Sequence, residues 1–224
     1  MAKPQRNRDH QIKESILEEL AWTAGVNADR LDVAINEGVV TLSGQVQTYP
    51  EKDAAVRAAL RVRGVTALAD EVEVNNGWAP REDAELALDA EQVILHEVPL
   101  ARGAVKATVH DRVVTLSGTV AWHYQRDAIR RHVIALPGVI GVQNSITLKP
   151  THTMASPELA ARNIKAALVR NAELDAEHVH VSAAGSQVTL TGQVSSWAER
   201  RQAEHAAWST PGVTHVENDI AVNF

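Results

Sequence analysis

The chain has 224 residues, of which 45% are apolar and 22% are charged, as in ordinary globular domains. It contains no cysteine, which excludes disulfides, thiolate metal sites and a cysteine nucleophile. The net charge of -6 argues against a general nucleic-acid-binding protein, because such proteins normally carry a basic surplus.

The N-terminal stretch 1–20 is polar and partly basic, and it lacks the apolar segment of a secretory signal peptide. No apolar run approaches the ~20 residues that span a bilayer. We therefore expect no transmembrane segment and a cytoplasmic location. A periplasmic location is the alternative if the chain is a trimmed mature form.

One short sequence occurs three times along the chain. It reads VVTLSGQV at 39–46, VVTLSGTV at 113–120 and QVTLTGQV at 187–194, so the copies lie 74 residues apart. A second motif, RGV or PGV, recurs with the same spacing at 63–65, 137–139 and 211–213. Two motifs that keep one register predict three tandem domains, at 1–75, 76–150 and 151–224.

Each repeat begins with a predicted amphipathic helix. In the first repeat Ile12, Ile16 and Leu20 follow the i, i+4, i+8 spacing of one helix face. The same spacing returns in the other two repeats, at Leu86, Ala90, Ile94, Ala160, Ile164 and Leu168.

A predicted β-hairpin follows the first helix. Leu31, Val33 and Ile35 alternate with polar residues, as in a half-buried strand, and a short turn at 37–38 leads into the strand 39–46. Corresponding turns are expected at 111–112 and near 185–186. A glycine lies on the inward side of each second strand, where we expect the close approach of a packed helix. These glycines are Gly44, Gly118 and Gly192.

A second helix and a last strand complete each repeat. Thr48 with Glu51 and Ser196 with Glu199 fit capping boxes, whereas Trp122 and Gln125 occupy these positions in the middle repeat. We expect the second helices to end at C′ glycines, namely Gly64, Gly138 and Gly212. Alternating apolar residues then predict a strand in each repeat, the first within 65–74.

The predicted fold class is therefore α+β, with three tandem αββαβ units. Each unit is a two-layer sandwich in which a three-stranded mixed sheet carries two helices on one face. The linkers at 75–81 and 149–157 are short and contain proline, so we expect limited hinge motion between units.

The repeated motifs resemble those of the BON domain, found in bacterial osmotically inducible and nodulation-associated proteins. The similar residues are VTLSG followed by valine at 40–46 and 114–120, VTLTG at 188–192, and PGV followed by valine and asparagine at 137–144 and 211–218. The first repeat departs from the tail pattern, with Arg63 in place of proline and Asp70 in place of asparagine.

The resemblance implies a non-enzymatic bacterial stress protein that binds phospholipid or a membrane surface. The partners it implies are anionic phospholipid or envelope proteins. Other members of the family imply a soluble scaffold, a chaperone-like role or a potassium-responsive binding protein. No catalytic residue, cofactor or metal ligand is carried over from the family, and the oligomeric state is left open.

Basic and aromatic residues of the second helices form the candidate anion or lipid surface. Lysine and arginine near a membrane attract phosphate head groups, and tryptophan and tyrosine suit the membrane interface. By sequence the three repeats carry net charges of -3, 0 and -3, which favours the middle repeat. The candidate residues are Lys52, Arg57, Trp122, Tyr124, Arg126, Arg130, Arg131, Arg200 and Arg201.

Other residues allow competing interpretations. His178 and His180 with His215 would form a metal site only if their strands lie close together. Small uncharged residues on the outward strand faces, such as Thr41 and Ser43, suit contact with another protein or a second copy. We expect Trp22 and Trp208 to pack against their own units.

Overall fold

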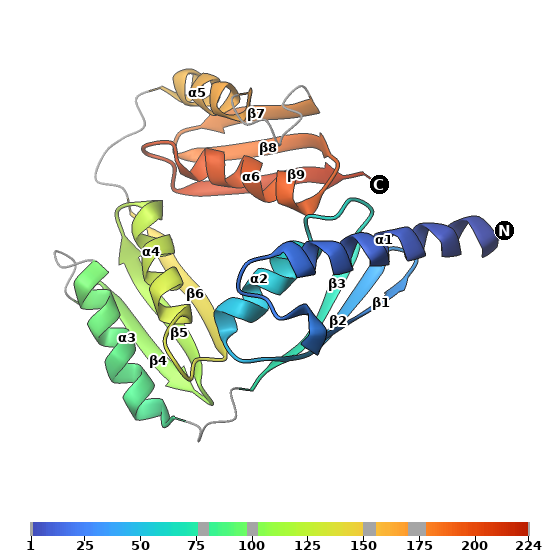
Figure 1. Ribbon diagram of the computed structural model, residues 1–224. Helices are drawn as coiled ribbons and strands as arrows, with labels where there is room; N and C mark the ends of the chain where they lie inside the picture. Colours follow the sequence, from blue (N-terminus) through green and yellow to red (C-terminus); the bar gives the residue numbers. More distant parts are fainter. Residues whose placement is uncertain (1, 76–80, 98–102, 150–155, 170–177, 224) are drawn as a thin grey trace.

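The computed structural model describes residues 2–75, 81–97, 103–149, 156–169 and 178–223, and these form three αββαβ units (Figure 1). The predicted fold class is confirmed. The linkers expected at 75–81 and 149–157 lie largely outside the described residues.

The units share one order of elements. Unit 1 consists of α1 (Ala2–Trp22), β1 (Leu31–Asn36), β2 (Val39–Val46), α2 (Tyr49–Ala59) and β3 (Ala67–Val74), with a short 3-10 turn, η1 (Ala28–Arg30), before β1. Unit 2 consists of α3 (Asp83–Glu97), β4 (Val105–His110), β5 (Val113–Val120), α4 (His123–Ile134) and β6 (Gly141–Leu148). Unit 3 consists of α5 (Pro157–Val169), β7 (Val179–Ala184), β8 (Gln187–Val194), α6 (Trp197–Trp208) and β9 (His215–Val222).

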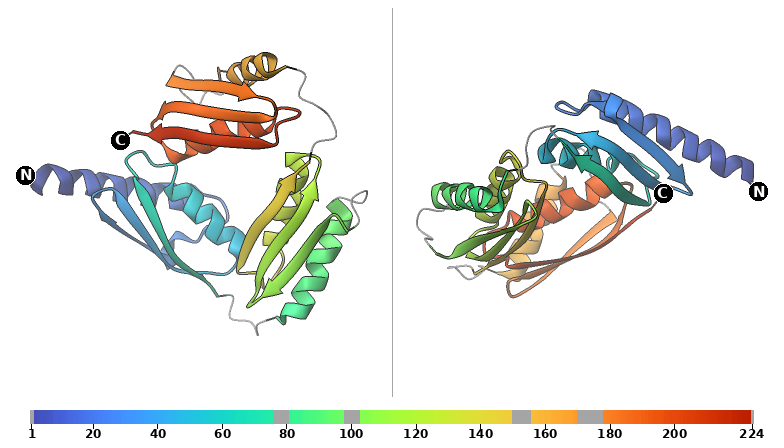
Figure 2. Two further views of the ribbon diagram at one scale, coloured as in Figure 1. Left: turned by 180° about the vertical axis from the view of Figure 1, so that it is seen from behind. Right: turned by 90° about the horizontal axis from the view of Figure 1, so that it is seen from below.

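Each unit contains a three-stranded mixed sheet with its motif strand in the centre. β1 pairs antiparallel with β2 as a hairpin, and β2 pairs parallel with β3 after the α2 crossover. The other units repeat both pairings in the same register. Two helices cover one face of each sheet, and the other face is seen from behind in the left view of Figure 2.

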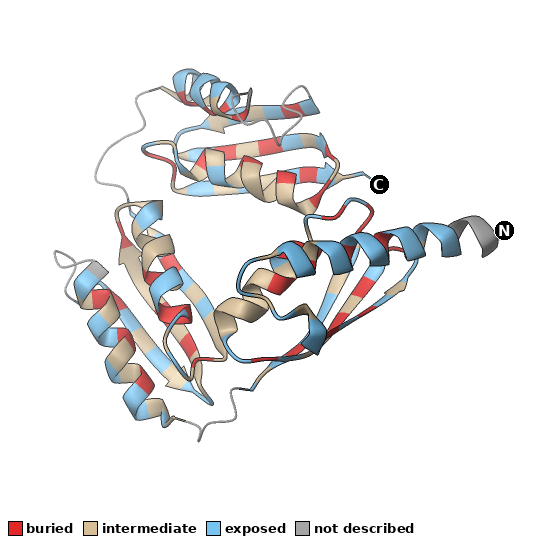
Figure 3. Cartoon of the chain, in the orientation of Figure 1, coloured by how far each residue is buried: buried red, intermediate tan, exposed pale blue. Residues whose placement is uncertain are grey.

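Each unit has its own apolar core between helices and sheet (Figure 3). In unit 1 Ile16 of the first helix and Ala55 of the second are fully buried. In unit 2 the first helix has Ala90 and the second helix has Ile129 at these positions. Unit 3 has the same order as unit 1, with Ile164 in the first helix and Ala203 in the second. The exchange conserves core volume, the kind of swap that close-packed interiors tolerate best.

Trp22 does not pack against its own unit, and that expectation was wrong. Its side chain is 88% exposed at the end of α1. The last buried residue of this helix face is Leu20, and Trp22 lies two positions later, which places it on a different side of the helix. Trp208 does pack against the core of unit 3, as expected.

The strand glycines meet a neighbouring backbone rather than a packed helix. Gly44, Gly118 and Gly192 have φ between +122° and +124°. A Cβ at Gly118 would overlap the carbonyl oxygen of Ala104, which accepts a hydrogen bond of 2.9 Å from Thr119 N. The expected approach of a helix was therefore wrong, because the residue just before the first strand of the unit fills this space.

The second set of glycines lies beyond the helix ends. Gly64, Gly138 and Gly212 have φ of +92°, +96° and +88°, a conformation that favours glycine. The second helices end earlier, at C-caps Leu60, Ala135 and Ser209. Hydrogen-bonded turns such as Leu136 N to Val133 O separate each helix from its glycine, so the expected C′ position was wrong.

The helix caps follow the predicted pattern. The Thr48 and Ser196 hydroxyls accept hydrogen bonds from the amides of Glu51 and Glu199, at 3.3 and 3.2 Å. In unit 2 one half of the capping box remains, since Gln125 Oε1 accepts from Trp122 N at 3.1 Å.

A carboxylate of the first helix holds the hairpin turn in units 1 and 2. Asp9 accepts hydrogen bonds from both turn amides, of Glu37 and Gly38, at 3.0 and 3.2 Å. Its equivalent Asp83 accepts from Asp111 N and Arg112 N at 2.9 and 2.8 Å. Pro157 occupies this position in unit 3. The carboxylate supports a turn whose residues 111 and 112 both have positive φ, at 49° and 62°.

Gly118→Ala is predicted to destabilise unit 2 by at least about 2 kcal/mol, because it combines an unfavourable φ with overlap of a backbone oxygen. Thermal or urea unfolding of the full chain measures the change. Gly141→Ala is the matched control in the same sheet, since its new Cβ meets only methyl groups of Val113 at 3.3 Å. Equal losses in both variants would contradict this role of Gly118.

Asp83→Ala is predicted to lower the stability of unit 2 by about 1–2 kcal/mol, because two turn amides lose a charged acceptor. Glu82→Ala removes the same charge at the neighbouring exposed position and controls for the helix dipole. If Glu82→Ala shifted the urea midpoint as far as Asp83→Ala, the turn contact would not be the cause.

Candidate functional site

The second helices α2, α4 and α6 lie toward the middle of the molecule, where the three units meet (Figure 1). Their first residues are Tyr49, His123 and Trp197, which occupy equivalent positions 74 residues apart. Each of these ring-bearing side chains faces the end of a second helix, or the turn after it, in another unit.

Trp197 of unit 3 reaches unit 1. Its indole Nε1 donates a hydrogen bond of 3.1 Å to the carbonyl oxygen of Val65, in the turn after α2. The guanidinium of Arg200 lies 5.5 Å from the centre of the same indole ring. The indole therefore joins α6 to the backbone of unit 1.

His123 of unit 2 reaches unit 3. Its ring stacks on Trp208, the last residue of α6, with centroids 4.9 Å apart and planes 5° from parallel. Arg126 lies over the same indole, 4.6 Å from its centre. The indole is thus in contact with two side chains of α4 while it also packs on the core of its own unit.

Tyr49 of unit 1 faces unit 2. It lines a cavity of about 340 Å³ together with residues 135–140, the turn after α4. Unit 1 thus meets unit 2, unit 2 meets unit 3, and unit 3 meets unit 1. Head-to-tail contacts of this kind form a closed ring when the rotation between units returns to its start. We call this arrangement the central junction.

Hydrogen bonds fix the state of His123 within the central junction. Arg126 Nη2 lies 2.8 Å from His123 Nδ1, and an arginine can only donate, so Nδ1 accepts. His123 Nε2 then carries the proton and faces Asp127 Oδ2 at 3.1 Å. Both bonds require the neutral imidazole in this tautomer.

Asp127 and Arg126 lie in a partly desolvated environment. Burial by itself raises the pKa of Asp127, but the hydrogen bond from His123 and the positive charge of Arg126 outweigh burial and lower it. Because its pKa is lowered in the folded state, this carboxylate stabilises the fold at pH values above its ordinary pKa of 3.8. The stabilisation is lost as the pH falls through the lowered pKa of the folded state. Burial lowers the pKa of Arg126, against the charges of Asp127 and Glu204.

Arginines from two units share one carboxylate on the other side of the junction. Asp53 of α2 lies 3.0 Å from Arg57 of its own helix and accepts a hydrogen bond of 3.3 Å from Arg130 of α4. Arg201 of α6 lies close enough for the charges of Asp53 and Arg57 to affect its pKa. Burial lowers the pKa of Arg201, the charges of Arg57 and Arg61 lower it further, and Asp53 opposes them.

Two of the candidate surface residues serve their own unit. Lys52 Nζ donates to the carbonyl oxygen of Val72 at 2.5 Å and pairs with Asp70 at 3.1 Å. The equivalent Arg200 donates to the carbonyl oxygens of Asn218 and of Ile220, the latter at 3.0 Å. Both side chains tie the second helix to the last strand.

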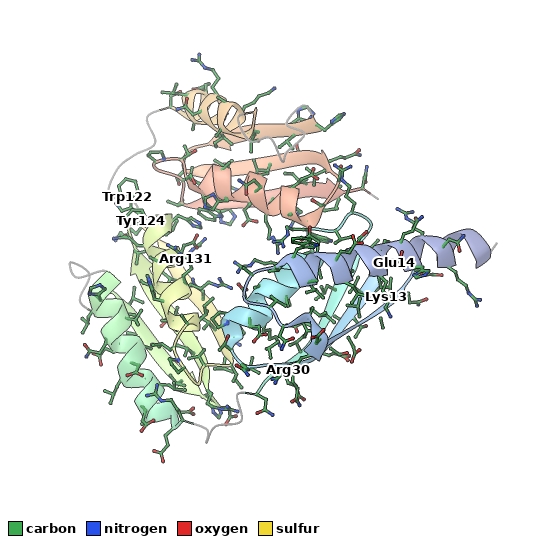
Figure 4. The ribbon with its side chains drawn as sticks, viewed as in Figure 1. Lys13, Glu14, Arg30, Trp122, Tyr124 and Arg131 are labelled. Carbon is green, nitrogen blue, oxygen red and sulfur yellow. The ribbon has the colours of Figure 1, made fainter. Side chains whose placement is uncertain are left out.

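Five of the seven remaining candidates line a cavity of about 640 Å³ at the junction. Arg57, Trp122, Tyr124, Arg130 and Arg131 line it, whereas Arg126 and Arg201 lie at the contacts described above. Tyr124 is 65% exposed and Arg131 is exposed. Figure 4 shows Trp122, Tyr124 and Arg131 along α4, away from Lys13 and Glu14 on α1.

The structure does not bring the three histidines together. His180 lies on β7 and His215 on β9, and β8 separates these two edge strands. No group of three potential metal ligands occurs among the residues that the structure describes. The condition for a metal site at His178, His180 and His215 is therefore not met among the described residues.

Within the described ranges, none of the helices is both long and apolar enough to cross a membrane. The expectation of a cytoplasmic location gains no support from this finding.

Two solved structures align with most of the chain at low similarity. The C-terminal domain of CdsD, the structural protein of the type III secretion system of Chlamydia trachomatis, is 13% identical over 94% of this chain and 96% of that chain, with a TM-score of 0.27. The PrgH periplasmic domain is 14% identical over 87% of this chain and 96% of that chain, with a TM-score of 0.22. We infer no function from either.

Comparison of sequences gives a clearer result. The osmotically-inducible protein Y of Escherichia coli (strain K12) is 30% identical over 131 residues, which cover 55% of this chain and 64% of the relative's length. The BON domain matches three times, at 8–76, 82–150 and 158–223. Each match covers the motif strand and most of both helices of one unit, and the chain belongs to the BON domain family.

Proposed function

We propose that this chain is a non-catalytic binding protein of the bacterial osmotic-stress response that attaches to anionic phospholipid surfaces. Its family membership and the osmotically inducible relative support the stress role. The observation that carries the membrane role is the exposed aromatic and basic face of α4.

This face combines the two residue types that a membrane interface selects. Tyr124 and Arg131 are seven residues apart, so they lie on one side of the helix. Tyrosine places an apolar ring and a polar hydroxyl at the head-group level, and arginine attracts the phosphates. Trp122 precedes the helix and lines the same cavity. We call Trp122, Tyr124 and Arg131 the α4 face.

The contacts of the central junction engage some of the basic residues of α4, and only the others can bind a membrane. Arg130 is engaged with Asp53, and Arg126 with His123 and Trp208. Arg131 forms no hydrogen bond or ion pair with the residues that the structure describes. It is therefore the arginine of α4 whose charge faces solvent without an internal counterion.

The uncovered sheet faces favour a second function, a scaffold that binds envelope proteins or a second copy. Thr41, Ser43, Thr115 and Ser117 are partly exposed there, and they are small and uncharged. They alternate along the strands with buried residues such as Leu42 and Leu116, so their rows lie on the face without helices. Light scattering across a concentration series separates the two functions, because a strict monomer would argue against self-assembly.

Arg131→Glu is predicted to weaken co-flotation with anionic vesicles by at least about tenfold, since each cation near such a surface contributes ~1 kcal/mol and the reversal changes two charges. Tyr124→Ala is predicted to weaken it less and with little dependence on salt. Neutral vesicles should not bind any variant.

Lys13→Glu makes the same charge reversal on the exposed face of α1, far from the α4 face (Figure 4). It should leave flotation nearly unchanged. If Lys13→Glu reduced flotation as much as Arg131→Glu, the attraction would belong to the overall charge and not to this face. Absence of flotation for the unmodified chain at low salt would exclude the membrane function.

A further inference from the structure

The 640 Å³ cavity at the central junction has walls from all three units. Unit 1 contributes Arg57, unit 2 contributes Arg130 and Arg131, and unit 3 contributes Ser209 and Thr210 from the turn after α6. Three guanidinium groups and two hydroxyl groups therefore line one space. The guanidinium groups and the Thr210 hydroxyl can donate hydrogen bonds to an anion, whereas the Ser209 hydroxyl donates to the carbonyl oxygen of His205 at 2.8 Å.

The positive charge of this wall is only partly compensated. Asp53 is the carboxylate that pairs with both Arg57 and Arg130. The acidic residue that lines the cavity, Asp127, pairs with His123 and lies near the positive charge of Arg126. Within the described residues, Arg131 has no carboxylate partner.

Arg201 adds to this positive environment from unit 3. It is half-buried near Arg57 and Arg61, and these charges disfavour its cationic form. Arg61 does not share Asp53, since it binds Glu19 at 2.9 Å. The carboxylate of Asp53 thus lies near arginines of all three units, namely Arg57, Arg130 and Arg201.

We propose that this cavity binds a small, soluble, multivalent anion of the phosphate class, held by Arg57, Arg130 and Arg131 with the hydroxyl of Thr210. Guanidinium groups match phosphate oxygens with paired N–H donors, and such charge-assisted bonds are among the stronger ones in proteins. The anion supplies the negative charge that Asp53 alone does not.

Binding in this position links the three units. An anion that contacts α2, α4 and the turn after α6 is lost when the junction opens, so it stabilises the closed ring by mass action. The site goes beyond membrane attachment, because it takes a free anion into the interior of the junction. A phosphate on a lipid head group has the same chemistry, and the test must separate the two sources.

Isothermal titration calorimetry of the full chain with sodium pyrophosphate at moderate salt tests the proposal. We expect one site per chain, with a parallel change in tryptophan fluorescence because Trp122 and Trp208 line the cavity. Arg131→Gln should weaken binding at least about tenfold, as expected for loss of a charge-assisted contact. This residue is chosen because Arg57 and Arg130 also hold Asp53.

Arg63→Gln is the matched control, because Arg63 is exposed and lies outside this cavity. Its affinity for pyrophosphate should equal that of the unmodified chain, and circular dichroism should show all three proteins folded. Absence of binding at millimolar pyrophosphate, or an equal loss in Arg63→Gln and Arg131→Gln, would overturn the proposal.

Vesicles that contain phosphatidic acid separate this proposal from the membrane function. Pyrophosphate binding without flotation supports the cavity site and excludes the membrane function. Flotation without pyrophosphate binding does the reverse. If pyrophosphate displaces the chain from vesicles at the concentration that fills the cavity, both phosphate sources use the same site.

Discussion

The arrangement of the three units depends on one repeated contact, the ring-bearing first residue of each second helix against the end of another second helix. His123 and Trp197 make direct contacts with another unit, and Tyr49 lines a cavity together with the turn after α4, in a cycle that closes after three units. Among the described helices and strands, the backbones of different units have few close contacts, and long side chains bridge them. Because each unit has its own core, the contacts set where the units lie and not whether they fold.

Closure of the ring also brings charged residues of the three second helices together. Asp53, Asp127 and Arg201 occupy the same position in the three second helices, so the third unit presents a cation where the others present a carboxylate. An exact threefold repeat would give each contact the same balance of charges. The substitution instead leaves arginine in excess on one side of the junction, beside the cavity. The asymmetry of the repeats thus creates a basic interior in a chain whose net charge is -6.

The 74-residue spacing was sufficient to predict the three units, the element order and the buried positions of the first helix of each unit, because burial follows helix and strand period. It could not identify what meets Gly118, since the oxygen of Ala104 reaches it only through strand pairing. The equivalence of Tyr49, His123 and Trp197 was visible in the sequence, but their partners in other units were not. The same holds for Arg126, whose charge suggested a solvent-facing surface although it lies over Trp208. Contacts between units leave no periodic signal, so sequence patterns within one unit do not reveal them.

Small-angle X-ray scattering of the full chain tests the closed junction most directly. Trp197→Ala with His123→Ala removes the indole hydrogen bond to unit 1 and the stacking on Trp208, and neither residue belongs to the apolar core of its unit. We predict that the unmodified chain gives the compact scattering profile of the closed ring and that the double variant, still folded by circular dichroism, has a larger radius of gyration. Equal radii of gyration, with an unmodified chain already as extended as the variant, would contradict closure through the second helices.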